Sequence, residues 1–466
     1  MTSLNLKALL PAAFAAASFS TIAIAQDDAL PQTLFTNVHV FDGVNEARIE
    51  NASVLVEGNL IKEVSTESID APNATMIDGG GRTLMPGLID GHTHFFFAVN
   101  GGVGAAEQMH WQYLGAMGTY AAKEHLHNGF TTVREAGGGA VGPGLKQAID
   151  EGYLEGPRIY PSGAWIGQTS GHQDFVTYGQ FDQTENNLYR LGFSINADGA
   201  DEVTAAVRKN LSLGASQIKI MVSGGVSSVK DPLHSSQMTE AEIRAAVDAA
   251  AAWDTYVMTH VYNDSDIKRA LEYGVKSIEH GQFMTDETAK LAIEKGAFIV
   301  SNLAGSTEGI LQHPAYSVEG SPVLVKTKQF LAGASNFKTV VNDNPDLKMV
   351  FQTDLVFTLG HDLRRGIDFE KWVLTDYLGN LRALRAMTST AGELMALSGK
   401  QNPYPGKLGV IEEGAYADIL VVDGNPLEDI TVIGANPEWI TAPDREEIAT
   451  MRVIMKDGVI YKNTLN

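Results

Sequence analysis

Short apolar runs and amphipathic helical stretches alternate along the middle of the chain, between about residues 84 and 400. The helical stretches repeat apolar positions three and four residues apart, as in 239–253, 264–273 and 285–295. The apolar runs, which predict strands, are Leu84–Ile89, Phe130–Val133, Arg158–Pro161, Gln217–Val222, Tyr256–Thr259, Lys276–Ile278, Phe298–Ser301 and Lys348–Gln352. Eight strands alternating with helices predict an α/β fold in which parallel strands form a (β/α)8 barrel, with chemistry at their carboxyl ends.

The two ends of the chain have the pattern of antiparallel β-structure instead. The expected strands are 34–41, 52–56 and 60–64 near the N-terminus and 417–422, 452–456 and 459–461 near the C-terminus. Glu57-Gly58-Asn59 is a hairpin sequence. Because the first segment is too short to bury both faces of a sheet alone, we expect 26–83 and 401–466 to combine into one discontinuous β-sandwich beside a barrel of residues 84–400.

Residues 1–25 have the features of a secretory signal peptide. Lys7 supplies the positive start, 8–25 is apolar and rich in alanine, and Ala23-Ile24-Ala25 has the spacing of a cleavage site. The alternative is a membrane anchor that stays, but the run is short for a span and contains Pro11. We therefore expect cleavage, secretion across the inner membrane, and a periplasmic protein without membrane attachment.

Charge and cysteine content narrow the possible partners and ligands. The chain of 466 residues has a formal net charge of −22 and no basic cluster, which argues against nucleic acid or an anionic membrane surface as a partner. An anionic small molecule remains compatible, because a bound cation would dominate its local field. The chain has no cysteine, so metal ligands must come from histidine, carboxylates and lysine.

The stretch Gly87-Leu88-Ile89-Asp90-Gly91-His92-Thr93-His94 carries the first candidate ligands. In an extended chain the i and i+2 side chains point to the same face, so His92 and His94 can reach one metal ion together. A His-x-His pair alone is a weak signal. His125 and His127 form another such pair, but at the end of a helical stretch, where the two side chains diverge, so we expect them at the surface.

Four further candidates end apolar runs of their own: Lys219, His260, His280 and Asp354. A lysine inside a buried strand is costly unless its charge is paired or removed. Lys219 either extends its ammonium group to the barrel rim or reacts with carbon dioxide to give a carbamate, whose two oxygens can bind two metals. His260 and His280, taken singly, fit hydrogen-bonded core histidines. Together with the first pair they favour metal ligation, and Asp354 could bind metal and accept a proton from water.

These motifs resemble those of the amidohydrolase superfamily of metal-dependent hydrolases. The likeness extends over nearly the whole chain after the signal peptide, and it includes Gly87–His94, Lys219-Ile220-Met221-Val222-Ser223-Gly224-Gly225, Ser277-Ile278-Glu279-His280-Gly281 and Gly414-Ala415-Tyr416-Ala417-Asp418. The chain is most similar to the branch of imidazolonepropionase-related and Xaa-Pro-dipeptidase-like carboxypeptidases, which includes ochratoxin-degrading amidases. That family has a TIM barrel with a composite β-sandwich, in agreement with the fold expected above.

The resemblance implies a centre of two divalent metal ions. It implies that the more buried metal is bound by His92, His94 and Asp354, the second by His260 and His280, and that N6-carboxylated Lys219 bridges both. Zinc is the expected metal, since imidazole and oxygen ligands suit it. Two cations that share a water would lower its pKa from ~16 toward ~7, so that hydroxide exists at neutral pH, and Asp354 would carry the proton to the leaving amine.

Two positions depart from the family pattern. Gln352 stands where family members commonly have a glycine, so we expect the space behind Asp354 to be narrowed or rearranged. Gly171-His172-Gln173-Asp174 matches the family's glycine–histidine loop only in part. His172 is a candidate contact for the substrate carbonyl, with an isolated loop histidine as the alternative. Tyr262 is a candidate donor to the substrate carbonyl or carboxylate, with a packing tyrosine as the alternative.

The branch resemblance implies a small-molecule substrate with an amide or peptide bond, either a dipeptide or an N-acyl amino acid. The same metal centre could instead act on a lactone, a cyclic amide or a phosphotriester. A non-catalytic periplasmic binding protein on this scaffold is the alternative from another class of function. The long segment 305–344, after the seventh strand, is a candidate lid or a contact in a homo-oligomer.

Overall fold

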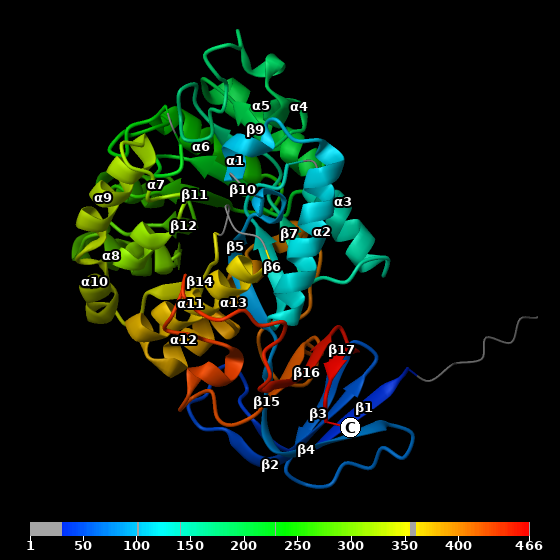
Figure 1. Cartoon of the computed structure of the whole chain (residues 1–466). Helices are drawn as coiled ribbons and strands as arrows, with labels where there is room; N and C mark the ends of the chain where they lie inside the picture. The colour runs from blue at the N-terminus through cyan, green and yellow to red at the C-terminus, as the bar shows by residue number, and fades with distance from the viewer. Residues whose placement is uncertain (1–29, 100–101, 140, 229, 355–359, 466) are drawn as a thin grey trace, which may run out of the picture.

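The computed structural model describes residues 30–99, 102–139, 141–228, 230–354 and 360–465. Within these ranges, ten short parallel strands and most of the helices form one region, and a sheet from the two ends of the chain lies beside it (Figure 1). The expected signal peptide, residues 1–25, lies outside the described residues. Among the described helices, none combines the length and the hydropathy that a membrane span requires.

The sheet from the chain ends has seven strands in the order β17-β16-β15-β4-β1-β2-β3. Its strands are β1 (Gln32–Val40), β2 (Ile49–Glu57), β3 (Leu60–Ser65), β4 (Thr75–Pro86), β15 (Ile419–Val422), β16 (Met451–Lys456) and β17 (Val459–Asn463). Neighbouring strands are antiparallel except β1 and β4, which are parallel. A cluster of buried side chains draws on both ends, from Phe35 and Val54 to Ile419 and Val453, so the two ends of the chain pair as predicted.

The parallel strands form a seven-stranded sheet, β14-β13-β12-β11-β10-β8-β9, and a three-stranded sheet, β5-β6-β7. They are β5 (Leu88–Thr93), β6 (Phe130–Glu135), β7 (Arg158–Pro161), β8 (Trp165–Gly167), β9 (Ser194–Asn196), β10 (Ile218–Met221), β11 (Val257–Val261), β12 (Ser277–His280), β13 (Phe298–Ser301) and β14 (Lys348–Phe351). The last strand meets the first, because the N–H of Asp354, just after β14, donates to the carbonyl oxygen of His92 in β5 at 3.0 Å. The fold is therefore α/β with parallel strands, as predicted.

Helices pack along the parallel strands (Figure 1). They are α1 (Gly102–Ala106), α2 (Trp111–His127), α3 (Val141–Asp150), α4 (Asn187–Arg190), α5 (Ala200–Ser212), α6 (Glu240–Ala251), α7 (Asp264–Glu272), α8 (Asp286–Glu294), α9 (Pro322–Ala334), α10 (Phe337–Asp343), α11 (His361–Leu378), α12 (Asn380–Ala386) and α13 (Ser389–Ala396). Thr239 and Glu242 form a capping box that starts α6, and Ile243 and Ala246 on its inner face are buried.

The predicted strand 84–89 was wrong, because this run is divided between two sheets. Residues Leu84 to Pro86 end β4 and pair with β15, and β5 begins at Leu88. Gly87 lies between them: its N–H donates to the Asp418 carbonyl oxygen at 2.9 Å, and a Cβ atom there would overlap the Thr131 side chain. A run that is apolar throughout has no periodicity to show where one sheet ends and the next begins.

The sequence pattern also missed β8 and β9. The chain passes from β7 to β8 through Ser162–Ala164, where Gly163 has a φ of +74°. Asn210 on α5 holds this irregular backbone, since its side chain donates to the Ala164 carbonyl at 2.9 Å and accepts from the Ala164 N–H at 3.1 Å. Strands of three residues are too short to produce a recognisable alternation.

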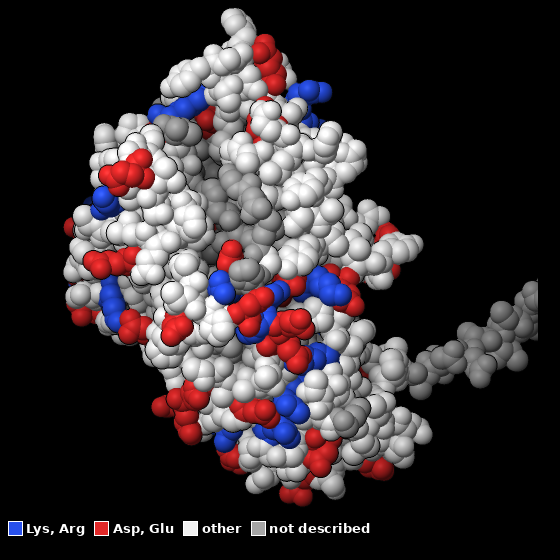
Figure 2. Space-filling view, viewed as in Figure 1, with Lys and Arg blue, Asp and Glu red and all other residues white. Residues whose placement is uncertain are grey.

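Charged side chains of both signs are interspersed over the face of the molecule shown in Figure 2. Lysine and arginine do not gather into a broad area on this face, and acidic side chains lie next to them. The distribution agrees with the absence of a basic cluster in the sequence.

Candidate metal centre

His92 and His94 lie at the carboxyl end of β5, where every residue of the strand is buried. Their Nε2 atoms face each other at 3.1 Å, as expected for i and i+2 side chains of an extended chain. The Nδ1 atom of His94 is buried and has no hydrogen-bond partner among the described residues. Burial lowers the pKa of both imidazoles, so both rings are neutral at pH 7 and can offer a lone pair.

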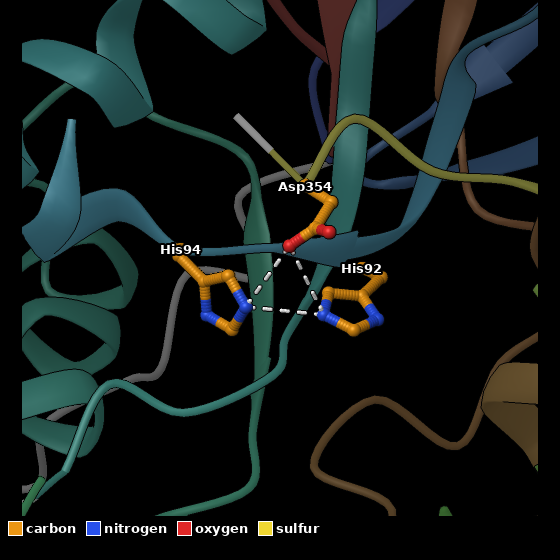
Figure 3. A group of neighbouring side chains, drawn as sticks. All are labelled: His92, His94 and Asp354. Atoms are coloured by element: carbon orange, nitrogen blue, oxygen red, sulfur yellow. Dashed lines mark hydrogen bonds and ion pairs between the residues drawn. The ribbon is translucent and has the colours of Figure 1, made fainter. Parts of the chain in front are cut away.

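Asp354 completes a group of three candidate ligands (Figure 3). Its Oδ1 atom is 3.3 Å from Nε2 of His94 and 3.6 Å from Nε2 of His92. The three ligand atoms lie within 4.8 Å of one another. Burial would raise the pKa of Asp354, but its hydrogen bond with His94 and its electrostatic interactions with His280, His94 and Lys219 lower it below the ordinary value, so a carboxylate faces the two rings. Two imidazole nitrogens and a carboxylate in this arrangement fit a divalent cation.

Lys219 lies in the middle of β10 and is 1% exposed. Burial lowers the pKa of its amine to about 8, although Glu279 and Asp354 act in the opposite direction. A substantial neutral fraction therefore exists at neutral pH, and the neutral amine is the form that reacts with carbon dioxide. The side chain is buried and lines a cavity at the carboxyl ends of the strands.

His260 in β11 and His280 at the end of β12 come from neighbouring strands, paired in parallel register. Their ring centroids are 4.6 Å apart, and the His280 ring is 5.3 Å from the His92 ring. Burial lowers the pKa of His260 far below its usual range and that of His280 to about 3. His280 has a φ of +72° and Asp354 a φ of +48°, a left-handed backbone conformation that is uncommon outside glycine and often occurs at functional sites.

One cavity brings all the predicted site residues together. It encloses about 850 Å³, counting its open mouth. Its walls include the aromatic side chains of Trp165, Phe175 and Phe330. The predicted site residues that line it are His92, His94, Lys219, His260, His280 and Asp354, with His172 and Tyr262 beside them. A concave site in which aromatic side chains stand beside convergent polar groups is a usual form of a small-molecule site.

Glu279 and Arg134, which the sequence pattern did not single out, hold His92 from behind. The Oε2 atom of Glu279 is 2.7 Å from Nδ1 of His92, and Arg134 donates to both carboxylate oxygens at 2.8 and 2.9 Å. All three side chains are buried. A carboxylate on Nδ1 keeps the proton there and turns the lone pair of Nε2 toward the cavity. The sequence did contain a signal for this pair: each of two strands carries a charged residue that becomes buried, Arg134 in β6 and Glu279 in β12.

Asp90 joins the end of β5 to the residues that precede Asp354. It accepts the N–H of His92 at 3.0 Å and the hydroxyl of Thr353 at 2.6 Å. His125 was predicted to lie at the surface, and this was wrong: it is 1% exposed, with Nδ1 2.9 Å from the Ala121 carbonyl and Nε2 3.4 Å from Asp90. Its helix, α2, packs against β6, which buries this side chain.

Gln352 lies beside His280 as well as behind Asp354. Its side chain is fully buried, and Nε2 is 3.4 Å from Nδ1 of His280. The Oδ1 atom of Asn302 is at the same distance from that nitrogen. The departure from glycine therefore affects the surroundings of a candidate ligand.

His172 and Tyr262 reach the cavity from two different loops. The His172 ring stacks on His260, with centroids 4.0 Å apart and planes 15° apart. The Tyr262 ring is 4.8 Å from His260 and 5.2 Å from His280. Tyr262 also packs against Phe330 of α9, so it both lines the cavity and contributes to packing.

Residues 83–461 match the sequence profile of the amidohydrolase family, which spans most of the chain. The protein belongs to this family of hydrolases. It is an enzyme that hydrolyses the carbon–nitrogen bonds of amides.

Individual relatives agree with this assignment. The ochratoxinase of Aspergillus niger is 29% identical over 427 residues, which cover 84% of this chain and 81% of the relative. A solved prolidase in complex with N-methylphosphonate-L-proline is 34% identical, with a TM-score of 0.80 over 93% of this chain and 100% of that chain. A Xaa-Pro dipeptidase with methionine bound in its active site is 28% identical, with a TM-score of 0.77 and the same coverage.

Proposed function

We propose that this enzyme is a metal-dependent amidohydrolase that cleaves the amide bond of a dipeptide or an N-acyl amino acid. One observation carries the proposal: a single cavity is lined by groups from five different strand ends, namely the imidazoles of His92, His94, His260 and His280, the buried Lys219 and the carboxylate of Asp354. The names of the similar proteins, a prolidase, a Xaa-Pro dipeptidase and an ochratoxinase, support an amide that bears a carboxylate.

The residues fit two divalent cations, for which zinc is the best match to the ligand set. In this proposal His92, His94 and Asp354 would hold the first cation, His260 and His280 would hold the second, and carboxylated Lys219 would supply oxygen ligands to the centre. The close approach of two imidazole nitrogens to a carboxylate supports the first site. The lowered pKa of the lysine amine supports carboxylation. Such cations, when bound, lower the pKa of water and stabilise negative charge on the scissile carbonyl oxygen.

The protein's own side chains then move the proton and orient the substrate. Asp354 accepts a proton from the attacking water and returns it to the leaving amine, which would otherwise leave poorly. His172 and Tyr262, on two sides of the His260 ring, contact the carbonyl or carboxylate of the substrate. The aromatic side chains of the cavity wall exclude water and pack against apolar groups of the substrate.

Several features of the whole molecule belong to the same proposal. We infer that the parallel strands close into a (β/α)8 barrel, since β14 meets β5, and that the terminal sheet folds over its core as a sandwich. The proposed domains are 26–83 with 401–466 around a barrel of 84–400, after a signal peptide of residues 1–25. A periplasmic location and a homo-oligomer are part of this proposal.

Hydrolysis assays on the purified protein test the proposal. We expect cleavage of dipeptides or N-acyl amino acids, loss of activity after chelation, and recovery with zinc and bicarbonate together. Asp354→Asn should lower kcat by roughly 100-fold or more. Cleavage only of lactones, cyclic amides or phosphotriesters would point to another substrate class. Tight metal binding without any hydrolysis would contradict catalysis and favour a binding protein.

A further inference from the structure

The ring of His172 is confined between two flat surfaces. One is the imidazole of His260, 4.0 Å away and nearly parallel. The other is the backbone of Gly225, where a Cβ atom would overlap the ring atoms of His172. Gly225 has no unusual backbone angle that would itself demand glycine, so the missing side chain serves the close approach of the ring.

The Nδ1 atom of His172 faces a loop whose Ser228 hydroxyl oxygen accepts a hydrogen bond from it. It is 2.9 Å from Oγ of Ser228 and 3.6 Å from Oδ2 of Asp231. The Ser228 hydroxyl donates to the Gly225 carbonyl oxygen at 3.0 Å, so its oxygen is left to accept from the imidazole. The proton is therefore on Nδ1. Nε2 has no hydrogen-bond partner among the described residues, and the His172 side chain lines the cavity.

Asp231 is itself fixed in place. It is 2% exposed, and its Oδ2 atom accepts the Gly225 N–H at 2.9 Å and the Gln237 amide at 3.1 Å. Burial alone would raise the pKa of Asp231, but His172 and Lys326 lower it below its usual range. The carboxylate thus remains negatively charged beside the Nδ1 side of the imidazole.

Lys326 of α9 ties this loop to the segment 305–344. Its ammonium group donates to the carbonyl oxygens of Gly225 and Ser228, both at 2.8 Å, and lies 3.5 Å from Asp231. The side chain is 8% exposed as a residue, so the pair is shielded from water. The segment 305–344, a candidate lid or oligomer contact, therefore supports the loop behind His172.

We propose that Asp231 and Gly225 are positioning residues that hold the His172 ring with Nε2 toward the substrate, and that Lys326 anchors their loop. This inference rests on the proposed function, in which His172 contacts the substrate. It assigns a role to Gly225 and Asp231 beyond the metal ligands. A misplacement of a contact group by about 1 Å can cost ~100-fold in rate, so the network has a measurable effect.

A double-mutant cycle tests the role of Asp231. We expect Asp231→Asn to lower kcat/KM by roughly 10- to 100-fold in the wild-type background. In the His172→Gln background the same change should have an effect of less than about twofold, because the group that it positions is already absent. An equal loss in both backgrounds, or no loss in the first, overturns the proposal. Zinc content and thermal midpoint are measured for each variant to verify a folded, loaded enzyme.

A steric variant tests Gly225. Gly225→Ala should reproduce the loss seen with His172→Gln. The matched control is Gly179→Ala, in the loop that carries His172, because a Cβ atom at Gly179 meets nothing within 4 Å. A second control, Lys230→Met, breaks an ion pair of 3.1 Å with Asp174 between the same two loops without touching the imidazole. We expect both controls to retain activity within about twofold.

Crystal structures of the variants test the position of the His172 ring directly, without relying on an activity assay. In Gly225→Ala and Asp231→Asn crystals, we expect the His172 ring to leave its stack on His260 or to turn Nδ1 away from Ser228. An unchanged ring position in both variants overturns the proposal even if their activity falls. If the wild type cleaves no amide, the proposed function fails, whereas the displaced ring would still support the positioning role.

Discussion

Burial of individual ionisable residues sets the protonation states on which the proposed chemistry depends. It lowers the pKa of His280 to about 3 and that of Lys219 to about 8. At pH 7 about a tenth of an amine with the latter pKa is neutral, against roughly one part in 3,000 for an ordinary lysine. Burial of Lys219 therefore raises the fraction of neutral amine, which is the form that the proposed reaction with carbon dioxide requires.

Replacing Lys219 by methionine should change the pH dependence of stability in metal-free, carbon-dioxide-free protein. The folded state lowers the pKa of this base from 10.5 to about 8, so the unfolded state binds more protons between these values. The buried amine therefore destabilises the wild type below pH 8, and this cost disappears as the pH rises toward 10.5. We expect the variant to be more stable at pH 7, by about 3 kcal/mol at most.

Thermal unfolding midpoints between pH 6 and pH 10 measure this effect. The difference between wild type and Lys219→Met should shrink as the pH rises. Lys209→Met, at an exposed site on α5, should show no such trend. A constant difference for Lys219→Met across the range would contradict a lowered pKa.

Glu279 is expected to control metal affinity without binding metal. Glu279→Gln replaces the carboxylate on Nδ1 of His92 by an amide and leaves Arg134 without its buried partner. We expect weaker zinc binding by about 10- to 100-fold, measured by competition with a chromophoric chelator. Glu370→Gln is the matched control, since that buried carboxyl bonds only to the backbone N–H groups of Leu303 and Ala304. Equal effects of the two substitutions would contradict a specific role of Glu279.

Among the elements, the parallel strands hold the candidate ligands in place. β5, β10, β11 and β12 each end at or carry a candidate ligand, and Asp354 follows β14. Hydrogen bonds between strands set their register: Met221 of β10 lies opposite His260, and Val261 of β11 lies opposite His280. Because parallel strands have their carboxyl ends at one edge, residues far apart in sequence meet there.

The junction between β4 and β5 should be sensitive to a single methyl group. A Cβ atom on Gly87 would overlap Thr131, a β-branched side chain that cannot easily rotate away. We expect Gly87→Ala to destabilise the protein by about 1–3 kcal/mol, measured by thermal or denaturant unfolding. Gly115→Ala in α2, where a Cβ atom meets nothing within 4 Å, should be neutral or stabilising. If Gly87→Ala left the free energy of unfolding unchanged, the backbone or Thr131 at this junction would have to move to admit the methyl group, which contradicts the prediction.

For the whole molecule, a buried charge cluster joins the terminal sheet to the parallel strands. Arg158 of β7 pairs with Asp418, which precedes β15, and with Asp457 at 2.7 Å, between β16 and β17. Its guanidinium also lies 4.2 Å from the ring centroid of Tyr416. Arg158 is 2% exposed and the Asp418 side chain 5%, so this pair is shielded from solvent, whereas the Asp457 side chain is 43% exposed. The cluster connects residues of the two regions that are 260 positions apart.

Breaking this cluster should destabilise the entire enzyme. Arg158→Met leaves Asp418 buried without its cation, and we expect a loss of about 3–5 kcal/mol. Arg158→Met combined with Asp418→Asn should recover part of that loss, because no buried charge is then unpaired. The control Lys290→Met removes an exposed i,i+4 pair with Asp286 and should leave the unfolding midpoint unchanged. Failure of the double variant to recover stability would contradict this account.

The prediction from sequence succeeded where one residue and its local pattern carry the information. The ligand-type residues lie in or just after apolar runs, and the runs are strands, so the sequence indicated that His92, His94 and the four later residues would meet, and they line one cavity. The prediction failed where a side chain's neighbour is remote. His125 was placed at the surface because nothing near it in sequence shows that Asp90 lies 3.4 Å away. The division of 84–89 was missed because both halves are equally apolar.

The sequence by itself determined the alternation of strands and helices and the kinds of side chain at the strand ends, since both follow from local periodicity and residue chemistry. Only the tertiary structure decided which side chains face one another. Glu279 behind His92 and Asp231 behind His172 depend on contacts across 187 and 59 positions of the chain, respectively, and no local pattern encodes them. Such contacts arise when packing of the strands brings distant segments to the same edge of the molecule.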